Sequence, residues 1–296
     1  MKRVAKVLAV LAVASLAFAQ QQQTPASQSS PANQQKNAPA NPAPTPPQGK
    51  RLPQAKTQAE FEAYKTAAAA TADTATMEKA ADDFAAKFPE SELRVLLYRA
   101  AMHGYQNANN GDKMSTMAEA VLKLDPDDPE ALIGEAEVLV ERTRDTDLDK
   151  DQRWGRAQQY AQHSLETIDT DVVIPAGTPQ ERVDAYKNLM RSSAYSILGA
   201  LALNQDKFSD AEGYFHKSID AYPAQPDPVV VLRLAIALDK QEKYADGLKQ
   251  ANRAVELTQD GTVAGKLARQ ERDRLVQLTG GIPAAPAPAG NNPPTH

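Results

Sequence analysis

The sequence predicts an all-α fold in which helix pairs stack side by side as a solenoid. Residues 192–225 form a 34-residue unit with the periodicity of two packed helices. Stretches with a similar pattern lie before and after this unit, and a helix pair that cannot bury its own apolar face needs such neighbours. The region that holds these units, residues 55–279, is long enough for one continuous core and lies between low-complexity ends.

The unit at residues 192–225 combines small and large side chains at helical spacing. We expect the small residues Gly199 and Ala211 to let the two helix backbones approach closely. Pro223 ends the second helix, because it lacks an N–H donor and clashes with the preceding turn. Large side chains with i, i+3, i+4 periodicity fill the seam between the helices: Tyr195, Leu198 and Phe215.

These offsets resemble the tetratricopeptide repeat, a 34-residue helix pair. With Ser192 as position 1, the matching positions are Tyr195 at 4, Leu198 at 7, Gly199 at 8, Ala202 at 11, Ala211 at 20, Phe215 at 24, Ser218 at 27 and Pro223 at 32. The resemblance implies a right-handed superhelical solenoid of antiparallel helix pairs that works by binding proteins. Segments around Ala86–Ser91 are also similar to exported bacterial repeat proteins.

The same pattern divides the rest of the region into about five helix pairs and a capping helix. The other units span about 58–91, 95–128, 129–169 and 228–261, and the capping helix spans 262–279. The unit at 58–91 is the weakest, because its pattern fits two frames. Residues that define the other units are Tyr98, Tyr105, Leu132, Ala136, Ala157 and Ala254.

Two segments depart from the repeat. The insertion Arg142–Gln152 has aspartate at alternate positions, as a calcium loop does, but Lys150 replaces the glycine and Arg156 replaces the bidentate glutamate of such a loop. We favour a solvated acidic connector, and a calcium-responsive or enzymatic module is the alternative. A capping box at Thr178–Glu181, with proline at the first helical position, predicts an unusually long helix over 179–204.

The ends of the chain indicate export. Residues 1–19 have a basic start, an apolar run and small residues before a cut after Ala19, which is typical of a signal peptide; an uncleaved anchor is the alternative. Residues 20–54 are predicted to form a disordered Gln/Pro/Ala-rich linker, and residues 280–296 a disordered Ala/Pro-rich tail. The chain has no cysteine for a disulfide or a lipid anchor. We therefore expect a periplasmic or secreted protein without stable membrane insertion after cleavage.

Charge and motifs favour a non-catalytic role. Cleavage would remove the positive charges of Lys2, Arg3 and Lys6 and change the net charge from -5 to -8, which disfavours nucleic acid as a partner. The four histidines show no metal-type spacing, and Gly261–Lys266 is one residue short of a phosphate loop. We expect no catalytic residue, no metal and no cofactor.

The resemblance implies a binding groove on the concave face formed by the first helix of each pair. Its lysine and asparagine clamp for a carboxylate is absent, so an extended or helical peptide of unknown identity fits better. The alternative is that Leu203, Leu232 and Ile236 belong to the core. A role in outer-membrane or cell-wall assembly is a second possible function. The candidate groove residues are Arg99, His103, Gln106, Ile133, Glu137, Ser196, Ala200, Leu203, Leu232 and Ile236.

Overall fold

The computed structural model describes residues 50–280, and within that range eleven α-helices follow one another along the chain. They form five antiparallel pairs and a final single helix, which confirms the predicted all-α solenoid. The predicted signal peptide, residues 20–49 of the linker and the tail after Gly280 lie outside the described residues. The pairs are α2 (Gln58–Ala68) with α3 (Thr74–Lys87), α4 (Arg94–Asn107) with α5 (Gly111–Leu124), α6 (Pro129–Arg142) with α7 (Lys150–Thr167), α8 (Gln180–Asn204) with α9 (Phe208–Ala221), and α10 (Pro228–Asp239) with α11 (Tyr244–Glu256); α12 (Val263–Thr279) follows them.

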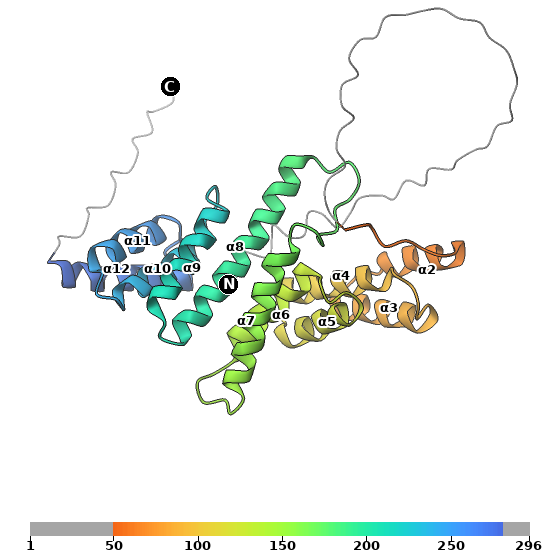
Figure 1. The fold of residues 1–296 in the computed structure, drawn as a ribbon, viewed down its shortest axis with the longest axis horizontal. Helices are drawn as coiled ribbons and strands as arrows, with labels where there is room; N and C mark the ends of the chain where they lie inside the picture. The colour runs from red at the N-terminus through yellow and green to blue at the C-terminus, as the bar shows by residue number, and fades with distance from the viewer. Residues whose placement is uncertain (1–49, 281–296) are drawn as a thin grey trace, which may run out of the picture.

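The pairs stack in chain order, so the described part is elongated, with α2 and α3 at one end and α12 at the other (Figure 1). Each helix packs against the next helix along the chain. In addition α6 contacts α8, α8 contacts α10, and α10 contacts α12. The first helices α6, α8 and α10 therefore lie side by side, and side chains of α4 reach the start of α6. We call the outer surface of these four helices the first-helix face.

Short polar residues begin many of these helices. The Asp128 carboxylate accepts a hydrogen bond from the Ala131 N–H at 2.9 Å, and Pro129 occupies the first turn of α6, where no N–H donor is needed. Asp227 accepts a bond from the Val229 N–H at 2.7 Å at the start of α10. Pro223 follows the end of α9 at Ala221, as the sequence predicts. Caps at these positions fix where one pair ends and the next begins.

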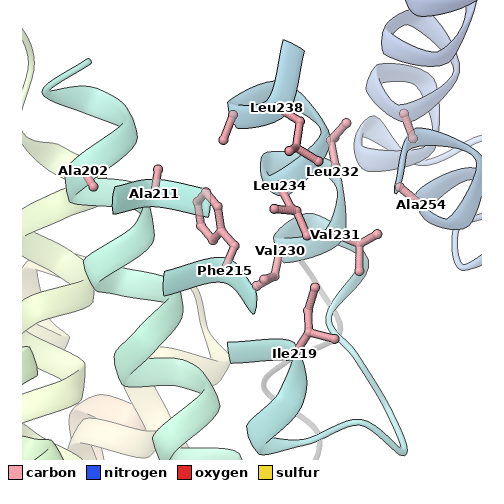
Figure 2. Packing of buried hydrophobic residues seen from close by; sticks show 12 residues of the cluster. Ala202, Ala211, Phe215, Ile219, Val230, Val231, Leu232, Leu234, Leu238 and Ala254 are labelled. Atoms are coloured by element: carbon pink, nitrogen blue, oxygen red, sulfur yellow. The ribbon is translucent and has the colours of Figure 1, made fainter. Parts of the chain in front are cut away.

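The core between α8, α9 and α10 explains why a glycine, Gly199, is needed in the unit at residues 192–225. Phe215 of α9 is fully buried and lies beside the apolar side chains of α10, including Leu234 (Figure 2). A Cβ atom on Gly199 would lie only 2.5 Å from the Cε1 atom of Phe215. The sequence predicts a close approach of Gly199 to Ala211, but the space beside Gly199 is filled by the Phe215 ring. Ala211 is buried in the same cluster as that ring.

Helix α8 is 25 residues long and covers the predicted range almost completely. The predicted capping box is wrong: Pro179 is itself the N-cap and makes no side-chain cap, while the Thr178 hydroxyl donates to the Pro175 carbonyl at 2.7 Å. The N-terminal half of α8 packs on the connector 168–179, where Ile168, Val172 and Met190 form a small buried cluster. This packing explains how the extra turns of α8 are held.

Residues 50–57, which we call the N-terminal strap, run beside the stack before α2. The backbone N–H of Lys50 donates to the Val172 carbonyl at 3.2 Å, and an isolated parallel β-bridge joins Lys50 to Val173. Residues 50–54, assigned to the linker by the sequence, thus contact the solenoid. The strap also forms ion pairs with residues just before α4, at the end of α5 and in the connector after α7: Arg51 with Glu92 at 2.9 Å, and Lys50 with Asp125 at 2.5 Å and Asp171 at 3.2 Å.

Candidate functional site

The first-helix face begins with a buried polar cluster that joins α4, α6 and α8. The Arg99 guanidinium donates a hydrogen bond to Asp128, and the Nε2 atom of His103 lies 2.9 Å from the Oε2 atom of Glu130. Burial alone would raise the pKa of Glu130, but the Arg99 charge and hydrogen bonds from His103 and Tyr186 lower this pKa to about 2. Burial, and then the nearby Glu130 charge, raise the pKa of Tyr186 well above its ordinary value.

This cluster brings together two predicted site residues, Arg99 and His103, but both interact with acidic residues of the same chain. Arg99 is only 9% exposed and Asp128 is 0% exposed. Removing one partner would leave the other charge buried and unpaired, which is strongly destabilising. We therefore assign Arg99 and His103 a role in fixing α4 against α6, at the edge of any ligand site.

The middle of the face holds the Glu137 carboxylate, whose surroundings disfavour its charged form. The Nε2 atom of Gln106 donates to the Oε2 atom of Glu137 at 3.5 Å, which is a long hydrogen bond. Burial, reinforced by the charge of Glu141 and more weakly by that of Asp227, raises the pKa of Glu137 to about 7. The bond from Gln106 and the charge of Arg233 act in the opposite direction and are too weak to compensate.

The charged residues that influence Glu137 lie on two different helices of this face. Glu137 lies on α6, whereas Asp227 and Arg233 belong to the start and body of α10, and α8 packs against both helices. Charges on α6 and α10 therefore influence each other across α8. The residues of α8 between them include Ser196, which is partly exposed, and Ala200, which is buried.

The apolar candidates fall into two groups. Ala200 and Leu232 are each 4% exposed, so the chain's own helices cover their side chains. Leu203 and Ile236 are partly buried against the core between α8, α9 and α10, and Ile133 is partly buried between α6 and α8. These three side chains keep some exposed apolar surface on or beside the face. Leu232 therefore belongs to the core, as the alternative interpretation of the sequence has it.

Sequence reasoning missed six polar residues of this region, of which Asp128 and Glu141 are two. Glu130 and Asp227 lie at the starts of α6 and α10, where an acidic residue is also expected for helix capping alone. Tyr186 lies in the extra turns of α8, outside the repeat unit, and Arg233 is one position after a predicted residue. The Asp-Pro pairs at 128–129 and 227–228 mark the starts of these helices, but nothing local indicates which side chains meet across helices.

The acidic insertion is ordered as part of the α6–α7 hairpin. Helix α7 begins at Lys150, inside the predicted insertion. The Lys150 Nζ atom lies 3.7 Å from an Asp145 carboxylate oxygen, and an Arg153 Nη1 atom lies 3.4 Å from an Asp147 oxygen. Across residues 50–280 no group of three or more His, Cys, Asp or Glu side chains is arranged to hold a metal ion. In the same range we find no helix with both the length and the apolar character needed to cross a membrane.

Comparison with known proteins gives a likeness of fold at low similarity. No family model and no curated protein matches the sequence. Among solved structures, the crystal structure of the APC/C hetero-tetramer Cut9-Hcn1 is similar, with 12% sequence identity and a TM-score of 0.34. The match covers 76% of this chain and 46% of that chain, so this protein spans less than half the length of the chain it matches.

Proposed function

We propose that this chain is a non-catalytic scaffold that binds a protein or peptide segment on its first-helix face. The setting of Glu137 carries the proposal. Burial and the charges of Glu141 and Asp227 raise the pKa of Glu137 to about 7, against the opposing influence of Gln106 and Arg233. Titratable groups in such unfavourable settings cluster at functional sites, because the binding event supplies what the free protein lacks.

The surroundings of Glu137 suit a segment that carries both a hydrogen-bond donor or cation and apolar side chains. A donor from the partner would replace the long bond from Gln106 and offset the excess negative charge. Partly exposed apolar surface from Ile133, Leu203 and Ile236 lies on or beside the same face. An extended or helical segment that follows the stack could contact several first helices at once.

We further propose that the protein works in the bacterial cell envelope, as a periplasmic or secreted protein. The signal-like residues 1–19 support this location. A role as an accessory in outer-membrane or cell-wall assembly is compatible with the same binding face.

Site-specific photo-crosslinking in cells tests the proposal. A photoreactive amino acid at Ser196, on the first-helix face of α8, should capture a partner protein that mass spectrometry then identifies. The matched control is the same amino acid at His216, an exposed residue of the second helix α9. The partner should be absent from the His216 sample. Capture of nothing but this chain itself at Ser196, or equal capture at both positions, would contradict the scaffold proposal.

A further inference from the structure

Helix α12 ends the stack with one side that no other helix of residues 50–280 covers. It packs against α10 and α11 as α10 packs against α8 and α9, so it takes the place of a first helix. No second helix follows it in the described chain, and it lies at the end of the stack (Figure 1). The buried side of α12 holds Gly265, Ala268, Leu275 and Val276. The opposite side is open.

The open side of α12 is partly apolar, although the last helix of a solenoid normally has a polar outer side. Val263 is 73% exposed, Leu267 49% and Leu278 48%. A fourth exposed leucine, Leu257, lies at the C-cap of α11. Within residues 50–280 the one other large apolar side chain that is exposed is Leu148, in the α6–α7 loop. Single exposed leucines are ordinary, but a row of them along one helix indicates a surface for a partner.

The exposed side chains of α12 form one stripe along the whole helix. Counting from Val263, the residues at i+4, i+7, i+11 and i+15 share one face of an α-helix. All of them are exposed, and we call this set the α12 stripe. It consists of Val263, Leu267, Gln270, Arg274 and Leu278. The stripe is apolar at both ends and polar toward its middle, so it is nearly symmetric along the helix.

This symmetry fits a second copy of the same helix in antiparallel orientation. If the two-fold axis lies between positions 270 and 271, Val263 of one copy is level with Leu278 of the other. Leu267 is then level with Arg274, whose hydrocarbon stem can cover the leucine. The two Gln270 amides meet beside the axis and can bond to each other. A parallel pair would instead place the two Arg274 guanidinium groups together.

Charges beside the stripe agree with the antiparallel arrangement. Lys266 and Asp273 are exposed and lie two turns apart on the same flank of α12. Within residues 50–280 the Lys266 side chain makes no hydrogen bond or ion pair, and Asp273 pairs only with its neighbour Arg272. In the antiparallel pair, Lys266 of each copy lies within one turn of Asp273 of the other, and such flanking charges set partner and orientation. We propose that two copies of this chain form an antiparallel dimer through their α12 stripes. The dimer does not depend on partner binding at the first-helix face.

Sedimentation equilibrium of the full chain tests the dimer. The mass of the parent should rise from one chain to two as the concentration increases. Leu267→Lys should raise the dissociation constant at least about tenfold, because the new charge lies opposite Arg274 of the other copy. The matched control is Leu148→Lys, at the exposed leucine of the α6–α7 loop, which should dimerise like the parent. A parent that stays monomeric, or equal losses in both variants, would overturn the proposal.

Charge exchange and cross-linking test the antiparallel order. Lys266→Asp alone should weaken the dimer, and adding Asp273→Lys should restore it, because the double variant regenerates both ion pairs. The chain has no cysteine, so single introduced cysteines report on distance. A short bismaleimide should join two Gln270→Cys chains but not two Gln277→Cys chains, whose cysteines lie about 20 Å apart along antiparallel helices. No restoration by the double variant, or equal cross-linking at both positions, would overturn the antiparallel dimer.

The segment after Gly280 is the other candidate to cover the α12 stripe. Deletion of residues 281–296 distinguishes the two occupants. The shortened chain should dimerise with the same dissociation constant as the parent if a second copy binds the stripe. If only the shortened chain dimerised, the chain's own tail would occupy the stripe, and the proposed dimer of the full chain would be wrong.

Discussion

At the scale of single residues, Glu137 makes stability depend on pH in a direction opposite to that of most carboxylates. Its pKa is about 7 in the folded chain against an ordinary value of 4.5. Between these pH values the folded chain keeps a proton that the unfolded chain releases, so rising pH favours unfolding. Glu141 on its own helix, Gln106 on α4, and Asp227 and Arg233 on α10 are the groups that set this pKa.

We predict that Glu137→Gln removes this penalty. Relative to the parent, the free energy of unfolding of the variant should change little near pH 4.5 and rise by about 1 to 3 kcal/mol by pH 8. Urea unfolding of both proteins at a series of pH values measures the difference. A difference that stays constant with pH would show that Glu137 ionises in the folded chain as it does in the unfolded chain.

The same residue shows what the sequence could predict about the site. The repeat offsets placed Arg99, His103, Gln106 and Glu137 on the first helices, because positions on a regular helix follow from spacing alone. Their electrostatic states could not be predicted. The state of Glu137 depends first on its burial among packed helices and then on charges that include Asp227, which is 90 positions further along the chain.

At the scale of helices, the α8–α9 pair depends on the missing side chain at Gly199. Gly199→Ala would place a methyl carbon 2.5 Å from the Phe215 ring, which is fully buried and cannot move freely. We expect this overpacking to lower the free energy of unfolding by about 1 to 3 kcal/mol, measured by chemical denaturation. The matched control is Gly213→Ala on α9, where a Cβ meets nothing within 4 Å.

The control should be neutral or stabilising by about 0.5 to 1 kcal/mol, because alanine favours the helix over glycine. Adding Phe215→Leu to Gly199→Ala should recover part of the loss if the ring is the cause. A parent-like Gly199→Ala protein would contradict the tight fit of Gly199 against the Phe215 ring.

Element boundaries were predictable where a local signal exists, and failed where contacts are distant. Pro223 and the Asp-Pro pairs act on their own turn, so the end of α9 and the starts of α6 and α10 agree with the sequence. The N-terminal strap was not foreseen. Its contact is between the backbones of Lys50 and Val172, which are far apart in sequence. The composition of the strap also resembles that of the linker before it.

At the scale of the whole molecule, contacts join only helices that are close along the chain. Helix α8 packs against α6, α7, α9 and α10, whereas α12 packs only against α10 and α11 among the principal helix contacts. In such stacks stability is close to a sum of local terms, so a defect should loosen the units around it and leave distant units folded. The two ends of this solenoid should therefore respond separately to mutations in their own cores.

Alanine substitutions of two buried side chains, one toward each end of the solenoid, would test this local response. Leu275 of α12 is 0% exposed and packs with Ala235 and Ala251, and Met102 of α4 is 1% exposed in the α4–α5 core. Each alanine variant should cost about 2 to 5 kcal/mol locally. Native-state hydrogen exchange should then quicken in α11 and α12 for Leu275→Ala, and in α4 and α5 for Met102→Ala. If either variant quickened exchange equally in all helices, the solenoid would unfold as one cooperative unit, and local terms could not describe its stability.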